Sequence, residues 1–196
     1  RSPQQWPQAA ADLKTIEKHA KNCKFIVEDL LNFARSSPTR KKMMDIHATI
    51  DEVVAFIQQH AGVSGIAIEK DYDDRVPGFI ADEKKIRQVL TNLIMNARHA
   101  VKDGGEIRLA THLDAIRGEA VVEVSDTGSG IRERDLPRIF DPFYTTKPTG
   151  EGTGLGLSVS YGIIQSHGGR IDVSTKPGSG STFTITLPLV TEHESD

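Results

Sequence analysis

The sequence has little cysteine and no excess of charge. Among its 196 residues there is one cysteine, Cys23, and the formal net charge is −3 at pH 7. A single cysteine cannot form an intrachain disulfide or a cysteine-based zinc site, so the chain is not a disulfide scaffold and is typical of a reducing compartment. The isoelectric point of about 6.2 argues against a dedicated nucleic-acid-binding protein, because such proteins present an excess of positive charge to phosphates.

The sequence also lacks long apolar runs. No stretch approaches the roughly 18 apolar residues that a membrane-spanning helix needs, and the first residues do not resemble a signal peptide. Hydrophobic residues make up 37% of the chain, which is enough to build a globular core. Because the sequence begins at Arg1 rather than Met, we expect it to be a piece of a longer protein.

The first 40 residues carry a heptad pattern. Apolar side chains recur at alternating spacings of three and four residues, which predicts a helix with a narrow apolar seam. Such a helix cannot bury its seam alone, so it packs either on its own globular domain or in a helical bundle. The period of 3.5 residues favours the bundle, and Pro38 ends the helix. The seam consists of Leu13, Ile16, Ala20, Cys23, Val27, Leu30 and Ala34.

Beyond residue 40 the sequence changes to short strands and amphipathic helices. A capping box at residues 49–52 predicts one helix start, Asp82 can cap a second helix that ends at Gly104, and a third helix ends before Gly168. We expect strands at residues 43–47, 66–71, 79–81, 106–112, 119–125, 170–175 and 182–187. Because strands and helices do not strictly alternate, the predicted fold class is α+β, a two-layer sandwich of a mixed sheet with helices on one face.

Three common phosphate-binding patterns are missing from the sequence. The P-loop needs a Gly-Lys dipeptide and none occurs, the dinucleotide fingerprint fails because Val159 takes its third glycine position, and the protein-kinase motifs are not found. Residues 152–157, Gly-Thr-Gly-Leu-Gly-Leu, nevertheless precede an apolar-periodic helix. Backbone N–H groups at such a helix start can approach an anion. A flexible loop at a helix start is an equally good interpretation of this segment alone.

Two other polar positions suit nucleotide chemistry. Asp126 follows an apolar strand and enters a glycine turn over residues 126–130, where its carboxylate could accept from an exocyclic amine. On its own, a turn-capping aspartate is the better interpretation. Asn92 and Asn96 lie four residues apart, on one helical face near the interior. Either a metal ion with phosphate oxygens or a hydrogen bond to the backbone would satisfy these amides.

Taken together, in this order and at this spacing, five segments resemble the boxes of sensor histidine kinases of two-component systems. Residues 92–97 resemble the N box, 126–130 the first glycine box, 139–144 the F box, 152–157 the second glycine box and 178–183 a third. The match covers residues from about 41 to 189 and implies an ATP-binding catalytic domain with the Bergerat (GHKL) fold. Within it, residues 143–147 and 167–169 are similar to the nitrogen-regulation type of sensor kinase.

The resemblance also implies how the chain is divided. Residues 30–35 resemble part of the second helix of the dimerisation and phosphoacceptor bundle, so we expect residues 1–40 to be that helix, without the first helix. Residues 41–190 would form the ATP-binding catalytic domain, and residues 191–196 a disordered tail. No histidine of the sequence lies in the context of a phosphoacceptor, so we expect that residue to lie outside this chain.

At the phosphate end of the site, the resemblance implies that Asn96 binds Mg²⁺ and that Asn92 supports the metal or the phosphates. These two asparagines are the candidate catalytic residues, and Lys147 is a candidate phosphate contact. The chain departs from many family members at His99 and Ala100, where a lysine and an aromatic residue are common. We therefore expect His99 to be a neutral surface histidine.

At the adenine end, Asp126 would accept from the adenine amine, and Thr182 or Ser181 would line the pocket. Phe140 and Phe143 would anchor one end of a lid over residues 145–152. The complete set of candidate ATP-binding residues is Asn92, Asn96, Asp126, Gly128, Gly130, Ile131, Phe140, Lys147, Gly152, Thr153, Gly154, Leu155, Gly156, Leu157 and Thr182.

The function implied by the resemblance is transfer of the ATP γ-phosphoryl group to a histidine on a dimerisation bundle, for relay to a response regulator. The expected partners are ATP or ADP with Mg²⁺, the bundle of the same kinase in a homodimer, and the response regulator, but no nucleic acid. The expected location is cytoplasmic, either in a soluble protein or in the cytoplasmic part of a membrane-anchored sensor.

Two alternatives stay open. One is an ATP-driven conformational machine of the same fold, of the gyrase, mismatch-repair or chaperone type. Those ATPases carry a glutamate at the position of Asn92, and an amide cannot act as a general base for water, so hydrolysis is disfavoured. The other is a degenerate module that only dimerises, and the retained Asn96, Asp126 and glycines argue against it.

Overall fold

The computed structural model describes residues 9, 12, 13, 16, 40–60, 65–101, 104–148 and 152–190. Of the predicted heptad seam, Leu13 and Ile16 fall within these residues, and both are helical. The rest of the predicted bundle helix and the predicted tail at 191–196 lie outside the described residues.

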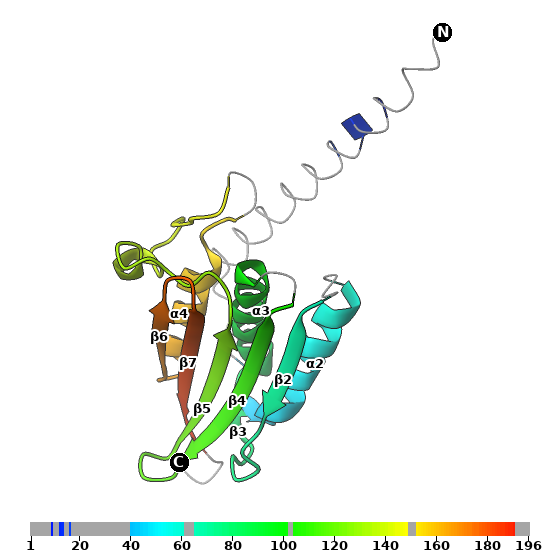
Figure 1. Cartoon of the computed structure of the whole chain (residues 1–196). Helices are drawn as coiled ribbons and strands as arrows, with labels where there is room; N and C mark the ends of the chain where they lie inside the picture. The colour runs from blue at the N-terminus through cyan, green and yellow to red at the C-terminus, as the bar shows by residue number, and fades with distance from the viewer. Residues whose placement is uncertain are drawn as a thin grey trace.

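The main element is a mixed five-stranded sheet with the strand order β2-β4-β5-β7-β6. Strand β2 pairs in parallel with β4, and all other neighbours in this sheet are antiparallel. Figure 1 shows the helices packed behind one face of this sheet, which confirms the predicted two-layer arrangement. The strands are β2 (Ala67–Asp71), β4 (Glu106–Asp114), β5 (Glu119–Asp126), β6 (Arg170–Lys176) and β7 (Gly180–Pro188).

Three helices supply the second layer: α2 (Ile46–His60), α3 (Glu83–Ala100) and α4 (Gly156–Ser166). The predicted cap of α3 is confirmed, because the Asp82 carboxylate accepts a hydrogen bond from the Lys85 backbone N–H at 3.2 Å. The helix ends at Ala100 rather than at Gly104. A short 3-10 turn, η1 (Leu136–Arg138), lies immediately before the F box. The buried face of α3 consists of Ile86, Val89, Leu90, Leu93, Ile94 and Ala97.

The start of α2 differs from the prediction. The capping box at residues 49–52 was expected to begin the helix, but α2 begins at Ile46, one residue after Asp45. The Asp45 carboxylate accepts from the backbone N–H groups of His47 at 2.8 Å and Ala48 at 3.3 Å. Thr49 lies inside the first turn and donates its hydroxyl to the Asp45 carbonyl at 2.8 Å. Asp45 therefore stabilises the helix start that the sequence pattern placed later.

A second, two-stranded sheet joins β1 (Lys42–Met44) to β3 (Phe79–Ala81) in antiparallel register. The predicted strand at 43–47 is thus shorter and begins one residue earlier, while β3 has the predicted bounds.

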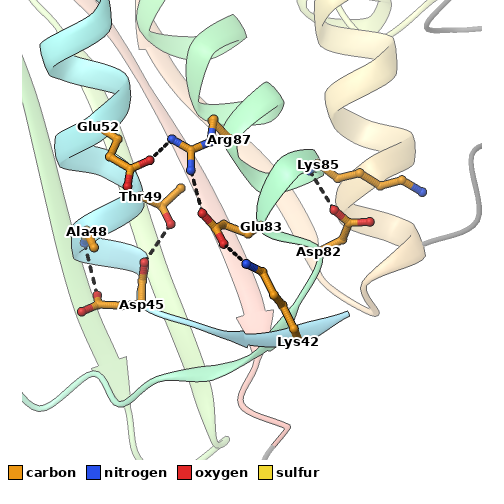
Figure 2. A network of polar contacts seen from close by, with 9 residues as sticks. All are labelled: Lys42, Asp45, Ala48, Thr49, Glu52, Asp82, Glu83, Lys85 and Arg87. Carbon is orange, nitrogen blue, oxygen red and sulfur yellow. Dashed lines mark hydrogen bonds and ion pairs between the residues drawn. The ribbon is translucent and has the colours of Figure 1, made fainter. Parts of the chain in front are cut away.

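Ion pairs tie this small sheet to the helices, as Figure 2 shows. Lys42 contacts Glu83 at 2.6 Å, Glu83 contacts Arg87 at 2.6 Å, and Arg87 also pairs with Glu52 on α2. The first turn of α3 is thereby connected both to β1 and to α2.

Candidate nucleotide-binding site

The N-box helix α3 presents Asn92 to the start of α4. The Asn92 side-chain amide donates to the Gly156 carbonyl at 3.1 Å and lies 3.3 Å from the Ser160 hydroxyl. The buried Ser160 donates its own hydroxyl to the same carbonyl at 2.8 Å. The backbone partner that the sequence left open for these asparagines is therefore found at Asn92. The hydrogen bond from Asn92 to Gly156 holds the N box and the second glycine box side by side.

Asn96 lies one turn further along α3 and contacts the side chain of a lysine. Its side-chain oxygen accepts a hydrogen bond from the Lys147 ammonium group at 3.1 Å. That ammonium nitrogen also lies 3.5 Å from Nδ1 of the exposed His99. The structure therefore brings the predicted metal ligand Asn96 and the predicted phosphate contact Lys147 together.

The side chains around Asn96 suit a Mg²⁺ ion that is shared with phosphates better than a metal ion that is held by protein side chains alone. Among the described residues, no cluster of three or more histidine, cysteine, aspartate or glutamate side chains could hold a metal ion. Mg²⁺ prefers oxygen ligands, keeps several waters, and is often held by one or two protein oxygens together with phosphates. The side-chain oxygen of Asn96 could supply one such protein oxygen.

At the other end of the site, Asp126 ends β5 and is only 8% exposed. Its carboxylate accepts from the Gly128 backbone N–H at 2.8 Å, which confirms the turn-capping interpretation. Burial raises the pKa of the Asp126 carboxyl, while hydrogen bonds from the Gly128 and Ser181 backbone act in the opposite direction. Such a carboxylate is oriented by the backbone and retains acceptor capacity for a further donor.

Ser181, rather than Thr182, shares a face of the sheet with Asp126. In the β5–β7 register, Asp126 is paired with Ser181, and Ser125 is paired with Thr182. Side chains of directly opposed residues lie on the same face, and successive residues alternate between faces. The Thr182 hydroxyl accordingly lies 2.9 Å from the Ser125 hydroxyl, on the face away from Asp126. Of the two alternatives for the adenine end, Ser181 and not Thr182 lies on the same face of the sheet as Asp126.

The first glycine box allows two backbone segments to meet. A Cβ at Gly128 would lie 2.5 Å from the Ala100 carbonyl oxygen, and Ser129 donates its N–H to that carbonyl at 3.1 Å. The end of α3 thus packs directly on the turn after Asp126. Further along this segment, Ile131 is half-buried and donates its N–H to the Thr175 hydroxyl at 2.9 Å.

The second glycine box packs on the F box. Gly154 has a positive φ of 69°, and a Cβ there would lie 2.3 Å from the Phe143 carbonyl carbon. Leu155 is buried and immediately precedes α4, and the Thr153 hydroxyl accepts from the Leu155 N–H at 3.3 Å. Leu157, in the first turn of α4, packs against the core. The glycines thus place the first turn of α4 against both α3 and the F box.

One expected anchor of the lid is wrong. Phe140 is half-buried, and its ring lies 5.4 Å from the Tyr161 ring. Phe143 by contrast is 62% exposed and has a positive φ of 67°. The backbone of Phe143 supports Gly154, but its side chain is not buried as an anchor would be.

Three polar residues in and around the site were not singled out from the sequence. Ser160 lies one turn after Gly156, and this spacing of four residues is the signal that could have identified it. Thr175 lies 2.9 Å from the Ser181 hydroxyl, across the β6–β7 pair. Asp135 accepts from the Tyr144 hydroxyl at 2.7 Å and from Arg132 at 2.6 Å, and these bonds lower its pKa. This last cluster connects the F box to the residues that precede η1.

An asparagine-bearing helix, a buried aspartate at a strand end and a glycine-started helix, all on one mixed sheet, define an ATP-binding domain of the GHKL class. The model of the family described as histidine kinase-, DNA gyrase B-, and HSP90-like ATPase matches residues 81–191, and the chain belongs to this family. The sensor kinase CckA of Brucella abortus is 36% identical over 94% of this chain, which spans 21% of that relative.

Solved structures agree with this assignment. The catalytic domain of the histidine kinase ThkA is 30% identical and has a TM-score of 0.69, covering 77% of this chain and 97% of that one. Full-length ShkA, solved in complex with AMPPNP, is 26% identical with a TM-score of 0.79, covering 95% of this chain and 39% of that one. The described domain is therefore the ATP-binding catalytic part of a sensor histidine kinase. Among the described residues, no helix is long and apolar enough to cross a membrane.

Proposed function

We propose that this chain binds ATP with Mg²⁺ and transfers the γ-phosphoryl group to a histidine on the dimerisation bundle of its own kinase. The observation that carries the proposal is the contact of α3 with the start of α4. Asn92 donates to the Gly156 carbonyl, and the side-chain oxygen of Asn96 accepts from the Lys147 ammonium group. The helix that carries the proposed metal ligand thus packs against a helix start, where N–H groups favour phosphate oxygens, and this supports the proposal.

The proposed roles follow from these positions. Asn96 would hold Mg²⁺ through its side-chain oxygen, and the metal would neutralise charge on the phosphates. The backbone of residues 154–157 would face the phosphates at the N-terminus of α4. Asp126 would accept the adenine amine, with Ser181 beside it on the same face of the sheet.

Asn92 favours phosphoryl transfer over hydrolysis. A water molecule needs a general base for attack, and an amide cannot accept that proton. The Asn92 amide is instead occupied in holding Gly156 and Ser160. The alternative of an ATP-driven conformational machine is disfavoured for this reason.

The partners of the whole protein belong to the same proposal. We infer that residues 1–40 form one helix of a homodimeric bundle and that the protein is cytoplasmic, either as a soluble kinase or as part of an anchored sensor. We infer a response regulator as the final acceptor, since the histidine kinase ThkA has been solved in complex with the response regulator protein TrrA. The narrower assignment to the nitrogen-regulation type stays a prediction.

The test combines this chain with a separately produced bundle that carries the phosphoacceptor histidine, in the presence of γ-labelled ATP and Mg²⁺. We expect acid-labile label on the bundle, and no label when its histidine is replaced by glutamine. Steady release of labelled phosphate without labelling of the bundle would instead identify an ATPase.

A further inference from the structure

The position of Lys147 carries an inference beyond phosphate binding. Its ammonium nitrogen lies 3.1 Å from the Asn96 side-chain oxygen, which is the oxygen assigned to Mg²⁺. The same nitrogen lies 3.5 Å from Nδ1 of His99. A cationic side chain from the segment after the F box therefore sits at the predicted metal ligand.

The backbone and the aliphatic chain of Lys147 also make contacts, which position its ammonium group at Asn96. The Lys147 backbone N–H donates to the Thr145 hydroxyl at 3.2 Å. A Cβ at Gly152 would lie 2.8 Å from that hydroxyl and 3.1 Å from Cδ of Lys147. The aliphatic part of Lys147 thus packs over a glycine, and its side chain is half-buried.

The chemistry of the two cations makes them competitors. The side-chain oxygen is the only atom of an asparagine amide that can bind a cation, whether ammonium or metal. Mg²⁺ would approach it to about 2.1 Å, and two cations that share one oxygen repel each other.

We propose that the Lys147 ammonium group and Mg²⁺ compete for the side-chain oxygen of Asn96, so that metal binding displaces Lys147 and the segment that carries it. This rests on the proposed function, because Asn96 is assigned to the metal there. Lys147 then sets the Mg²⁺ dependence of the site. With Lys147 on Asn96, the ammonium group supplies a positive charge at the position of the metal. For this reason the site binds nucleotide without Mg²⁺. Replacing the ammonium group by the metal then takes a higher Mg²⁺ concentration than it would in a site without the lysine.

The first experiment measures the Mg²⁺ concentration at half-conversion of the ADP complex, by fluorescence or calorimetry at saturating ADP. In Lys147→Met, which keeps the aliphatic stem, we expect this midpoint to fall roughly tenfold, as for the loss of one charge-assisted hydrogen bond. We also expect ADP affinity in the presence of a chelator to fall.

Lys84→Met is the matched control. Lys84 is exposed and lies on the same helix, twelve residues before Asn96, which is roughly 18 Å along the helix axis. It removes the same charge from the protein, and we expect its Mg²⁺ midpoint to equal that of the wild type. An unchanged or higher midpoint in Lys147→Met overturns the competition. A wild-type chain that binds no nucleotide at all overturns instead the proposed function.

A second measurement follows the segment directly. In the wild-type ADP complex, we expect the backbone amide resonances of residues 144–148 to shift as Mg²⁺ is added. The side-chain amide resonances of Asn96 should move over the same Mg²⁺ range. If the Asn96 signals respond while those of residues 144–148 stay fixed, the metal does not displace Lys147 and the inference is wrong.

Discussion

At the scale of single residues, Asp126 gives the sharpest test of nucleotide recognition. Its carboxylate is buried and oriented by the Gly128 N–H. We expect Asp126→Asn to weaken ATP binding by roughly 1.5–3 kcal/mol, the size of a hydrogen bond to a charged group, and to destabilise the fold by less. Calorimetry of the wild-type chain and the variant with ATP measures the loss of affinity. Calorimetry with GTP shows whether Asp126 selects the adenine amine. Equal affinity of the wild-type chain for ATP and GTP would show that Asp126 does not select the adenine amine.

The neighbouring pair Ser181 and Thr182 tests the register of the sheet. Because Ser181 lies on the face of Asp126 and Thr182 on the opposite face, we expect Ser181→Ala to lower ATP affinity severalfold. Thr182→Ala should leave it unchanged, and the two variants serve as controls for each other. The reverse order of effects, measured by the same titration, would place the nucleotide on the other face.

These residues also mark how far the sequence could predict the site. Asp126, Asn92 and Asn96 were identifiable because each stands in a motif whose spacing is local. The choice between Ser181 and Thr182 was not, because a shift of one residue in strand pairing moves a side chain to the other face. The contact of Lys147 with Asn96 joins residues 51 apart, and local spacing carries no signal for such a pair.

At the scale of elements, features that depend on local sequence patterns were predictable, and features that depend on contacts between distant segments were not. The bounds of β3, the cap of α3 and the presence of strands β4 and β5 follow from local patterns, and the structure confirms them. The start of α2 was misplaced because both Asp45 and Thr49 are good capping residues, and the sequence pattern favoured the later one. The pairing of β1 with β3 joins two strands that α2 and β2 separate in the sequence, and no local pattern reports such a pairing.

The end of α4 and the start of α3 are joined by His167, and this junction should respond to pH. His167 is 6% exposed, and its Nε2 accepts from the Asp82 N–H at 3.0 Å. Its Nδ1 lies 2.8 Å from the Ile163 carbonyl, so the neutral ring carries its proton on Nδ1. Burial lowers the pKa of His167 below its ordinary value, with the Ile163 carbonyl acting in the opposite direction.

The sign of the pH effect follows from that direction. Below pH about 6.5 the unfolded chain binds a proton at this histidine before the folded chain does, so stability falls as pH falls through this range. We expect urea unfolding to show that His167→Gln has lower stability than the wild type at pH 7.5. The variant should also lose less further stability between pH 7.5 and 5.5, by a difference on the order of 1 kcal/mol. Parallel pH profiles of the two proteins would exclude His167 as the responsible group.

At the scale of the whole molecule, the chain combines the five nucleotide-binding motifs with at least two histidines, among the described residues, that make structural contacts. His47 stacks on the Tyr72 ring at 4.6 Å and bonds the Thr111 hydroxyl at 2.9 Å. His167 is buried between α4 and Asp82. These positions suit structural contacts, and none of the seven histidines of the sequence stands in a phosphoacceptor context.

We therefore expect this chain to bind ATP without labelling itself, and to phosphorylate a bundle histidine that is supplied by another molecule. The transfer should be slow, because a tether normally supplies the effective concentration that brings the acceptor to the γ-phosphate. The measurement is incubation with γ-labelled ATP, with and without the separate bundle, followed by location of the acid-labile label. Raising the bundle concentration should raise the rate in proportion until the chain is saturated. Label on any histidine of this chain in the absence of the bundle would contradict the prediction, since it would mean that an acceptor lies within these 196 residues.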